Sequence, residues 1–216
     1  MNRVALIGCG GLGVPAAWTL ALAGVRHFRL IDPDRVELSN LHRQVLYATA
    51  DVGRLKAEVL AEILRAQFDA DVDVQIQRLT PENTGLLLEN CDAALEGSDD
   101  ALAKFAVNDW AIQQPRERLA VIAAAIGRAG QWLTVTPTSS CYRCIFEQPP
   151  PVESLETCAS AGVLGPLTGQ VGAYAALSLV HARTGHADAA VGALMRLSPR
   201  GLLRTHVARA PGCLCA

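Results

Sequence analysis

Short apolar runs alternate with longer segments of helical periodicity along most of this chain. Residues 3–8, RVALIG, form a continuous apolar run, which is typical of a parallel strand buried on both faces. Residues 27–32, HFRLID, form a second such run, and residues 13–24 and 53–68 place apolar side chains at helical spacing. Strands that alternate with helices in this way predict an α/β protein with a mainly parallel sheet.

The pattern continues towards the C-terminus. We expect further strands at residues 71–79, 91–100, 119–127 and 130–137 (the last a candidate edge strand), helices at 100–114 and near 168–182, and a C-terminal pair of short strands. No repeat or low-complexity linker divides the chain, so a single domain over residues 1–216 is expected. The predicted fold is a doubly wound, Rossmann-like sheet with its ligand site at the carboxyl ends of the strands.

Composition and charge exclude several classes of function. The 216 residues are 50% hydrophobic, and 19 basic against 21 acidic side chains give a net charge of −2, so no nucleic-acid-binding field is expected. No apolar run reaches the roughly 20 residues that span a bilayer, and the start of the chain does not resemble a signal peptide. We therefore expect a cytoplasmic protein without a membrane partner. Its seven cysteines then favour metal binding or chemistry over disulfides.

A glycine-rich turn lies between the first strand and the first helix. Residues 8–13, GCGGLG, match G-x-G-x-x-G, which makes Gly8, Gly10, Gly11 and Gly13 candidates for nucleotide binding. Asp32 follows about 20 residues later, where an acid that binds a ribose is expected. Alone, this motif suggests an NAD-dependent oxidoreductase, and the alternative is a turn that only packs its glycines.

The segment after Asp32 favours a different nucleotide. Asn40 and Arg43 follow the second strand, and Lys56 lies in the first turns of the next helix. An amide, a guanidinium and an ammonium near the glycine-rich turn suit a triphosphate better than a dinucleotide. Arg43 could instead form a structural ion pair, and Lys56 could be a solvated helix lysine. His42, within the same segment, is left without a role.

Several segments together resemble the ThiF/MoeB/HesA family, relatives of ubiquitin-activating enzymes. The segments are VALIGCGGLG, DPDRVELSNLHRQ, DVGRLKAEV, EGSDD, GRAGQWLTV, CYRC and CASAGVLGPLTGQVGAYAA. The resemblance implies that ATP and magnesium are used to adenylylate the C-terminal carboxylate of a ubiquitin-like sulfur-carrier protein, with release of pyrophosphate. It also implies a homodimer, and it makes a sulfur-donor protein a candidate further partner.

The resemblance implies roles for the candidate residues. The glycine-rich turn would line the ATP phosphates, Asp32 would hold the ribose, and Asn40, Arg43 and Lys56 would contact phosphate oxygens. Asp99 falls at the position of the magnesium-associated aspartate, and Asp100 is the alternative. Residues 1–137 would form the nucleotide-binding core, and residues 138–216 a region that binds zinc and contacts the carrier.

Five cysteines are candidates for metal binding or chemistry. Cys141 and Cys144, with Cys213 and Cys215, form the two close pairs of a tetrahedral zinc site. The resemblance implies the same site, although the family has C-x-x-C where this chain has C-x-C, so four reduced thiols are the alternative. Cys158 falls where the family has a loop cysteine that, in some members, forms a covalent link to the carrier. A passive loop cysteine is the alternative for Cys158.

One departure from the family concerns an arginine. Most members carry an N-terminal helical segment whose arginine reaches the ATP phosphates of the dimer partner, whereas this sequence begins two residues before its first strand. Arg35, another arginine or a partner could supply the charge, or the activity could be weak or absent.

From the motifs and the resemblance together, we expect an adenylyltransferase. A non-catalytic nucleotide-binding partner of a heteromeric assembly and an NAD-dependent oxidoreductase are the alternatives.

Overall fold

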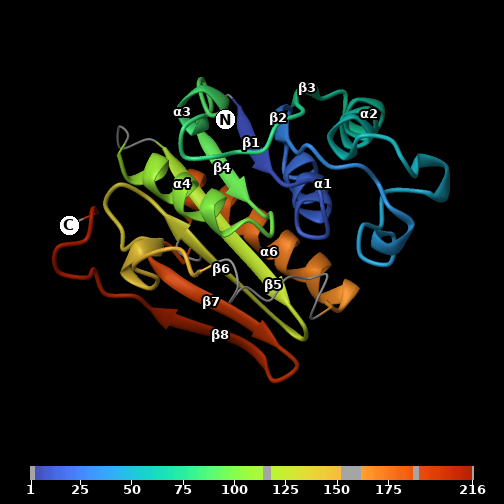
Figure 1. Cartoon of the computed structure of the whole chain (residues 1–216). Helices are drawn as coiled ribbons and strands as arrows, with labels where there is room; N and C mark the ends of the chain where they lie inside the picture. The colour runs from blue at the N-terminus through green and yellow to red at the C-terminus, as the bar shows by residue number, and fades with distance from the viewer. Residues whose placement is uncertain (1–2, 114–117, 152–161, 187–189, 216) are drawn as a thin grey trace.

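One eight-stranded sheet, in the order β3-β2-β1-β4-β5-β6-β7-β8, organises the chain (Figure 1). The computed structural model describes residues 3–113, 118–151, 162–186 and 190–215. The strands are β1 (Val4–Ile7), β2 (His27–Ile31), β3 (Asp71–Gln75), β4 (Ala93–Glu96), β5 (Leu119–Ile126), β6 (Ala129–Val135), β7 (Ala193–Ser198) and β8 (Gly201–His206). The α-helices are α1 (Gly13–Leu22), α2 (Lys56–Phe68), α3 (Thr84–Leu87), α4 (Ala101–Ile112) and α6 (Gly165–Thr184), with 3-10 turns η1 (Leu38–Asn40), η2 (Thr49–Asp51) and η3 (Tyr142–Cys144).

The sheet has a parallel part and an antiparallel part. Strands β3, β2, β1, β4 and β5 pair in parallel, and β6, β7 and β8 continue the sheet in antiparallel pairing. The chain builds outward from β1 to β3 and then returns to the other side of β1 with β4. This reversal opens a crevice at the carboxyl ends of β1 and β4. The prediction of a doubly wound, mainly parallel Rossmann-like sheet is confirmed.

Helices cover both faces of the parallel part. Helices α1, α2 and α6 share one core with Val4 and Leu6, whereas α3 and α4 share the other core with Ala5 and Ile7. Figure 1 shows α6 behind the sheet and α4 in front of it. All four residues of β1 are buried because alternate side chains enter the two cores, which explains why the strand is apolar without interruption.

A close contact between helices places α6 against the glycine-rich turn. A Cβ atom on Gly172 would lie 2.3 Å from the carbonyl oxygen of Leu12, so only glycine permits this approach. Further along α6, Ser178 Oγ accepts a hydrogen bond of 2.9 Å from the buried indole N–H of Trp132. The packing brings Thr168, near the start of α6, to the edge of the cavity described below.

Three expected features differ from the structure. Residues 130–137 were a candidate edge strand, but β6 lies inside the sheet because β7 pairs along its other side. Strand β4 ends at Glu96, since the side chain of Glu96 accepts hydrogen bonds from Ser98 and turns the chain into α4. Strand β3 ends at Gln75, and the residues after it lead into the short helix α3, which the sequence did not predict. No helix within the described residues combines the length and apolarity needed to cross a membrane.

Candidate active site

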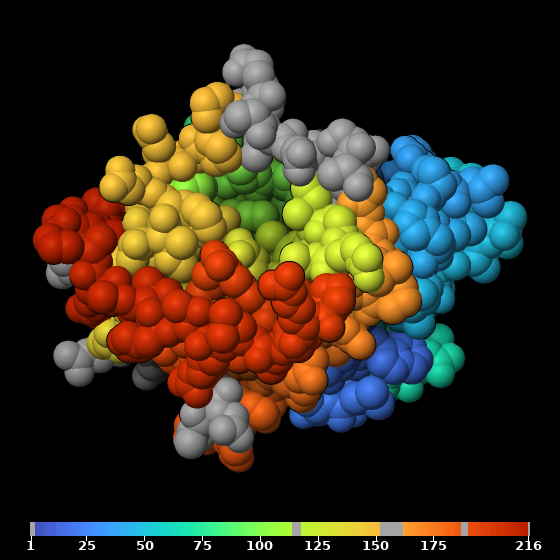
Figure 2. Space-filling view, turned by 90° about the horizontal axis from the view of Figure 1, so that it is seen from below, coloured from blue at the N-terminus to red at the C-terminus, as the bar shows by residue number. Residues whose placement is uncertain are grey.

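A cavity of about 770 Å³ lies at the carboxyl ends of the parallel strands. It extends from the glycine-rich turn, past the start of α4, to the antiparallel strands β6, β7 and β8. Figure 2 shows a hollow bordered by β7 and β8 and by residues 138–150. One continuous cavity therefore joins the glycine-rich turn to the antiparallel strands.

The glycine-rich turn presents backbone donors to this cavity. Gly8 has φ +85°, and a Cβ atom on Gly13 would lie 1.8 Å from the Gly8 carbonyl oxygen, so both positions require glycine. The N–H groups of Gly10, Gly11 and Leu12 have no acceptor in the described part of the chain. These donors precede helix α1, whose N-terminus carries a partial positive charge. The turn is thus suited to bind phosphate.

Asp32 is fixed at the end of β2 on the cavity's edge. One carboxylate oxygen accepts a hydrogen bond of 2.6 Å from the N–H of Cys9, and the other accepts one of 2.8 Å from Asp34. Burial raises the pKa of Asp32, and the two N–H donors oppose that increase. Because each carboxylate oxygen has two lone-pair sites, acceptor capacity remains for ribose hydroxyl groups.

Arg43 and Gln44 approach the turn from the loop that follows β2. Arg43 donates to the side-chain oxygen of Asn40, and its Cγ lies 3.3 Å from the position that a Cβ on Gly11 would take. Gln44 is buried beside the cavity, and its amide oxygen has no hydrogen-bond donor within the described residues. Asn40 does not line the cavity and bonds to Glu37 and Arg43 instead. The sequence showed the polarity of Gln44 but not its burial, so its place in the site was missed.

Lys56 enters the cavity from the first residue of α2. Its side chain is 9% exposed, and its Nζ lies 3.0 Å from Asp34 Oδ2. Hydrogen bonds between the backbones of residues 34–36 and 53–56 close the base of the loop that carries Arg43. The ammonium group thus pairs with one exposed carboxylate and lines the same cavity as the glycine-rich turn, where a phosphate would add a second anionic partner.

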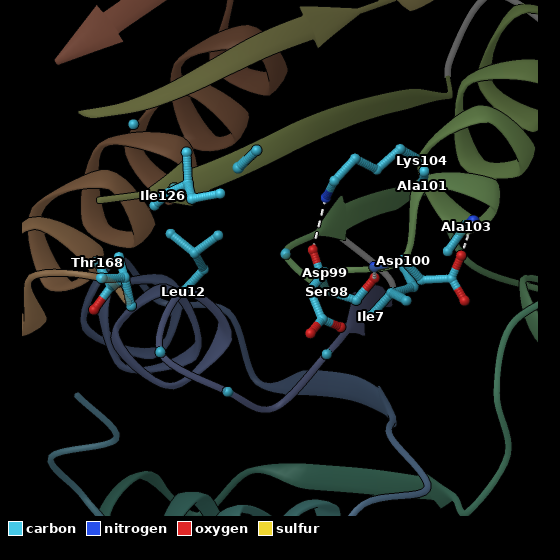
Figure 3. A pocket seen from close by; sticks show the side chains of 18 of the residues that line it. Ile7, Leu12, Ser98, Asp99, Asp100, Ala101, Ala103, Lys104, Ile126 and Thr168 are labelled. Atoms are coloured by element: carbon cyan, nitrogen blue, oxygen red, sulfur yellow. Dashed lines mark hydrogen bonds between the residues drawn. The ribbon is translucent and has the colours of Figure 1, made fainter. Parts of the chain in front are cut away.

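Asp99 and Asp100 lie side by side but have different surroundings (Figure 3). Asp100 caps α4, because one of its oxygens accepts hydrogen bonds from the N–H groups of Leu102 (2.9 Å) and Ala103 (3.3 Å). Its other oxygen lies 3.1 Å from the guanidinium of Arg78. Asp99 is exposed, lines the cavity and has no hydrogen bond or ion pair to the described residues. Asp99 is therefore the carboxylate that is free for a cation.

A buried ion pair lies beneath Asp99 and was not found from the sequence. Lys104 donates to a Glu96 carboxylate oxygen at 2.5 Å and to the carbonyl oxygens of Ser98 (2.7 Å) and Ala123 (2.8 Å). Figure 3 shows Lys104 reaching from α4 towards the Ser98 turn. Glu96 is fully buried, which raises its pKa, while the ammonium of Lys104 acts in the opposite direction. The hydrophobic pattern of the sequence does not show that these two charged side chains are buried.

Four thiols converge beside the antiparallel strands. The Sγ atoms of Cys141, Cys144, Cys213 and Cys215 all lie within 4.8 Å of one another. Neighbouring pairs are 3.4 to 3.9 Å apart, close to the roughly 3.8 Å edge of a tetrahedron of thiolates around zinc. The C-x-C spacing therefore accommodates a four-cysteine metal site. In addition, the N–H of Ala210 points to Cys144 Sγ at 3.4 Å, as expected for a metal thiolate.

Two further predicted residues need comment. Arg35 donates to the carbonyl oxygen of Gly53 at 2.7 Å and does not line the cavity, whereas Arg78 and Arg196 do. Cys158 lies outside the described residues.

The fold and the glycine-rich turn define a nucleotide-binding protein of Rossmann type. Residues 1–215 match the ThiF family, and the chain belongs to that family. It is 37% identical over 196 residues to "Adenylyltransferase and sulfurtransferase uba4" of Aspergillus terreus, which covers 86% of this chain and 40% of the relative. It is 38% identical over 205 residues to "Adenylyltransferase and sulfurtransferase MOCS3" of Sus scrofa, and this alignment covers 93% of this chain and 44% of the relative. The chain thus spans about two fifths of the length of these relatives.

Solved structures support the fold. E. coli MccB with ATP superposes with a TM-score of 0.83 at 19% identity, over 99% of this chain and 66% of that chain. The structure of PaaA superposes with a TM-score of 0.75 at 22% identity, over 97% of this chain and 65% of that chain. At these identities the likeness concerns the fold alone.

Proposed function

We propose that this chain adenylylates the C-terminal carboxylate of a ubiquitin-like sulfur-carrier protein. The carboxylate attacks the α-phosphorus of ATP, an acyl-adenylate forms and pyrophosphate leaves. The observation that carries the proposal is the single cavity that joins the phosphate-binding turn to the surface of the antiparallel strands. Relatives named adenylyltransferases, which are more than a third identical to this chain over the aligned residues, support it.

The site contains the groups that this reaction needs. Two anions react, so cations and N–H donors around the phosphates matter more than a general base. In this proposal Arg43 and Lys56 neutralise phosphate charge, Gln44 accepts a hydrogen bond from the nucleotide, and Asp32 binds the ribose. Asp99 would hold magnesium, which neutralises charge on the phosphates when bound.

The other end of the cavity suits an extended tail. Ala124, Ala125, Ala129 and Gly130 line it on β5 and β6, and none of them projects a long side chain. A tail that ends in small residues can therefore lie close to the sheet and direct its carboxylate towards the turn. This geometry favours a polypeptide carboxylate as the substrate.

We further propose that zinc occupies the four-cysteine site and has a structural role. Four thiolates leave no open coordination position for a substrate. The site joins the C-terminal segment to the loop after β6. Arg143 in that loop pairs with both carboxylate oxygens of Asp109 on α4, at 2.7 and 2.8 Å. The metal would thereby hold one side of the cavity in place.

ATP–pyrophosphate exchange tests the proposed reaction. Purified protein is incubated with ATP, magnesium, labelled pyrophosphate and candidate ubiquitin-like carriers. We expect exchange with at least one carrier and none when its C-terminal glycine is removed. ATP binding without exchange for any carrier would favour a non-catalytic nucleotide-binding role. Tight binding of NAD and no binding of ATP would favour an oxidoreductase.

A further inference from the structure

A row of side chains crosses the antiparallel strands on the cavity side of the sheet. The strand registers pair Ala124 on β5 with Gln131 on β6, Gln131 with Arg196 on β7, and Arg196 with Leu203 on β8. All four residues line the cavity. We call this set the cross-strand row. It forms the floor at the end of the cavity that is remote from the glycine-rich turn.

Arg196 is the charged member of the cross-strand row. Its side chain is exposed, and no hydrogen bond or ion pair links it to the part of the chain that the structure describes. The acidic residues that line the cavity all lie at the other end, and they are Asp32, Asp34, Asp99 and Asp100. Within the described residues, the lining near Arg196 is apolar or neutral, and no carboxylate of that lining lies beside the guanidinium as a countercharge. An anionic group on the ligand would complement it.

The distance between Arg196 and the turn that carries Asp99 limits how many residues can separate the anionic group from the substrate's reacting carboxylate. Strand β7 lies three strand positions from β4, which leads into the turn carrying Asp99. Neighbouring strands are about 4.8 Å apart, so the three steps cover about 14 Å, or about four residues of extended peptide. With the reach of the arginine side chain, the range becomes about three to six residues.

We propose that Arg196 binds an acidic side chain in the substrate's C-terminal tail, about three to six residues before the carboxylate that is adenylylated. The proposal rests on the proposed function. It adds that Arg196 discriminates between substrate tails that differ in charge. Asp or Glu at that position pairs with the guanidinium, and Lys or Arg there is rejected because two cations would face each other in a partly enclosed space.

The neighbouring strand offers a matched control. Arg204 on β8 is also exposed, but it lies opposite Met195, so it projects from the other face of the sheet and does not line the cavity. Arg196→Gln and Arg204→Gln each remove one exposed charge from the antiparallel strands. Only Arg196→Gln should change the recognition of a tail.

Peptides test the proposal directly. The probes are ten-residue peptides that end in Gly-Gly in an alanine and serine background, with an N-terminal fluorophore. A single Glu is moved from the third to the eighth position from the C-terminus, and matched series carry Gln or Lys instead. Binding to the full chain is measured by fluorescence anisotropy with magnesium and a non-hydrolysable ATP analogue.

We expect Glu at one position between the third and the sixth to lower Kd about tenfold relative to Gln, as for a charge-assisted hydrogen bond that is partly shielded from water. Arg196→Gln should remove this difference, Arg196→Glu should make the Lys peptide the tighter ligand, and Arg204→Gln should change neither. Affinity for the ATP analogue should be the same in all four proteins, which verifies folding.

Equal affinities for the Glu and Gln series, a Glu preference that persists in Arg196→Gln, or no binding of any peptide would each overturn the role of Arg196. Those outcomes leave the proposed reaction standing if carrier-dependent pyrophosphate exchange is observed. Absence of exchange with every carrier, despite selective binding of acidic peptides, would contradict the reaction instead.

Discussion

Lys104 and Glu96 form a buried ion pair directly beneath the turn that carries Asp99. Their charged atoms are 2.5 Å apart, and Glu96 is fully buried. Ser98 is held from two sides, because its N–H donates to Glu96 and its carbonyl oxygen accepts from Lys104. The pair therefore fixes the backbone immediately before Asp99.

The first prediction concerns this pair. Lys104→Met should destabilise the protein by about 3–5 kcal/mol, since Glu96 would remain buried without a cation. A Lys104→Met, Glu96→Leu double variant should recover much of that loss, because no uncompensated charge remains. Its pyrophosphate exchange should nevertheless need more magnesium for half-maximal rate, because nothing holds the Ser98 carbonyl. Urea unfolding and magnesium titrations measure the two effects. Normal magnesium dependence in the folded double variant would limit the pair to a structural role.

The second prediction separates Asp99 from Asp100. Asp100→Ala removes the α4 cap and the partner of Arg78, so it should lower the unfolding free energy by about 1 kcal/mol and leave most of the activity. Asp99→Ala should leave stability nearly unchanged, since Asp99 makes no hydrogen bond or ion pair with the described residues, and should remove most of the magnesium-dependent exchange. Thermal melts and exchange assays on both variants make the comparison. Loss of exchange in Asp100→Ala alone would reverse the assignment.

Asp99 and Asp100 illustrate which features of the site could be predicted from the sequence and which could not. The glycine-rich turn, the acid after β2 and the basic residues after it are local patterns, and the structure places Asp32, Arg43 and Lys56 along one cavity. The choice between Asp99 and Asp100 depends on which carboxylate caps α4, and adjacent identical residues give no pattern that decides it. Gln44, Lys104 and Arg196 were missed because their significance comes from burial or from cross-strand register, which only the assembled sheet determines.

The third prediction concerns the cations. Arg43→Ala and Lys56→Ala should each slow pyrophosphate exchange about a hundredfold, as expected when one charge is removed near a transferring phosphoryl group. Arg35→Ala should reduce exchange by less than threefold, because Arg35 donates to the Gly53 carbonyl and lies outside the cavity lining. A loss in Arg35→Ala equal to that in Arg43→Ala would show that Arg35 reaches the phosphates after all. ATP affinity measured by calorimetry distinguishes weaker binding from slower chemistry.

The last prediction concerns the four thiols. The purified chain should carry about one zinc ion, because all four Sγ atoms converge at distances suited to tetrahedral coordination. Cys141→Ser and Cys213→Ser should lose the metal and lower the melting temperature, since metal binding contributes to the free energy of folding. Cys158→Ser serves as the control, because the other four thiols suffice for a tetrahedral site, so this variant should retain zinc and exchange activity. Elemental analysis of protein purified without chelators, with melting curves, provides the measurement. Metal-free wild-type protein that melts at the same temperature as Cys213→Ser would show that the four thiols are reduced and unligated.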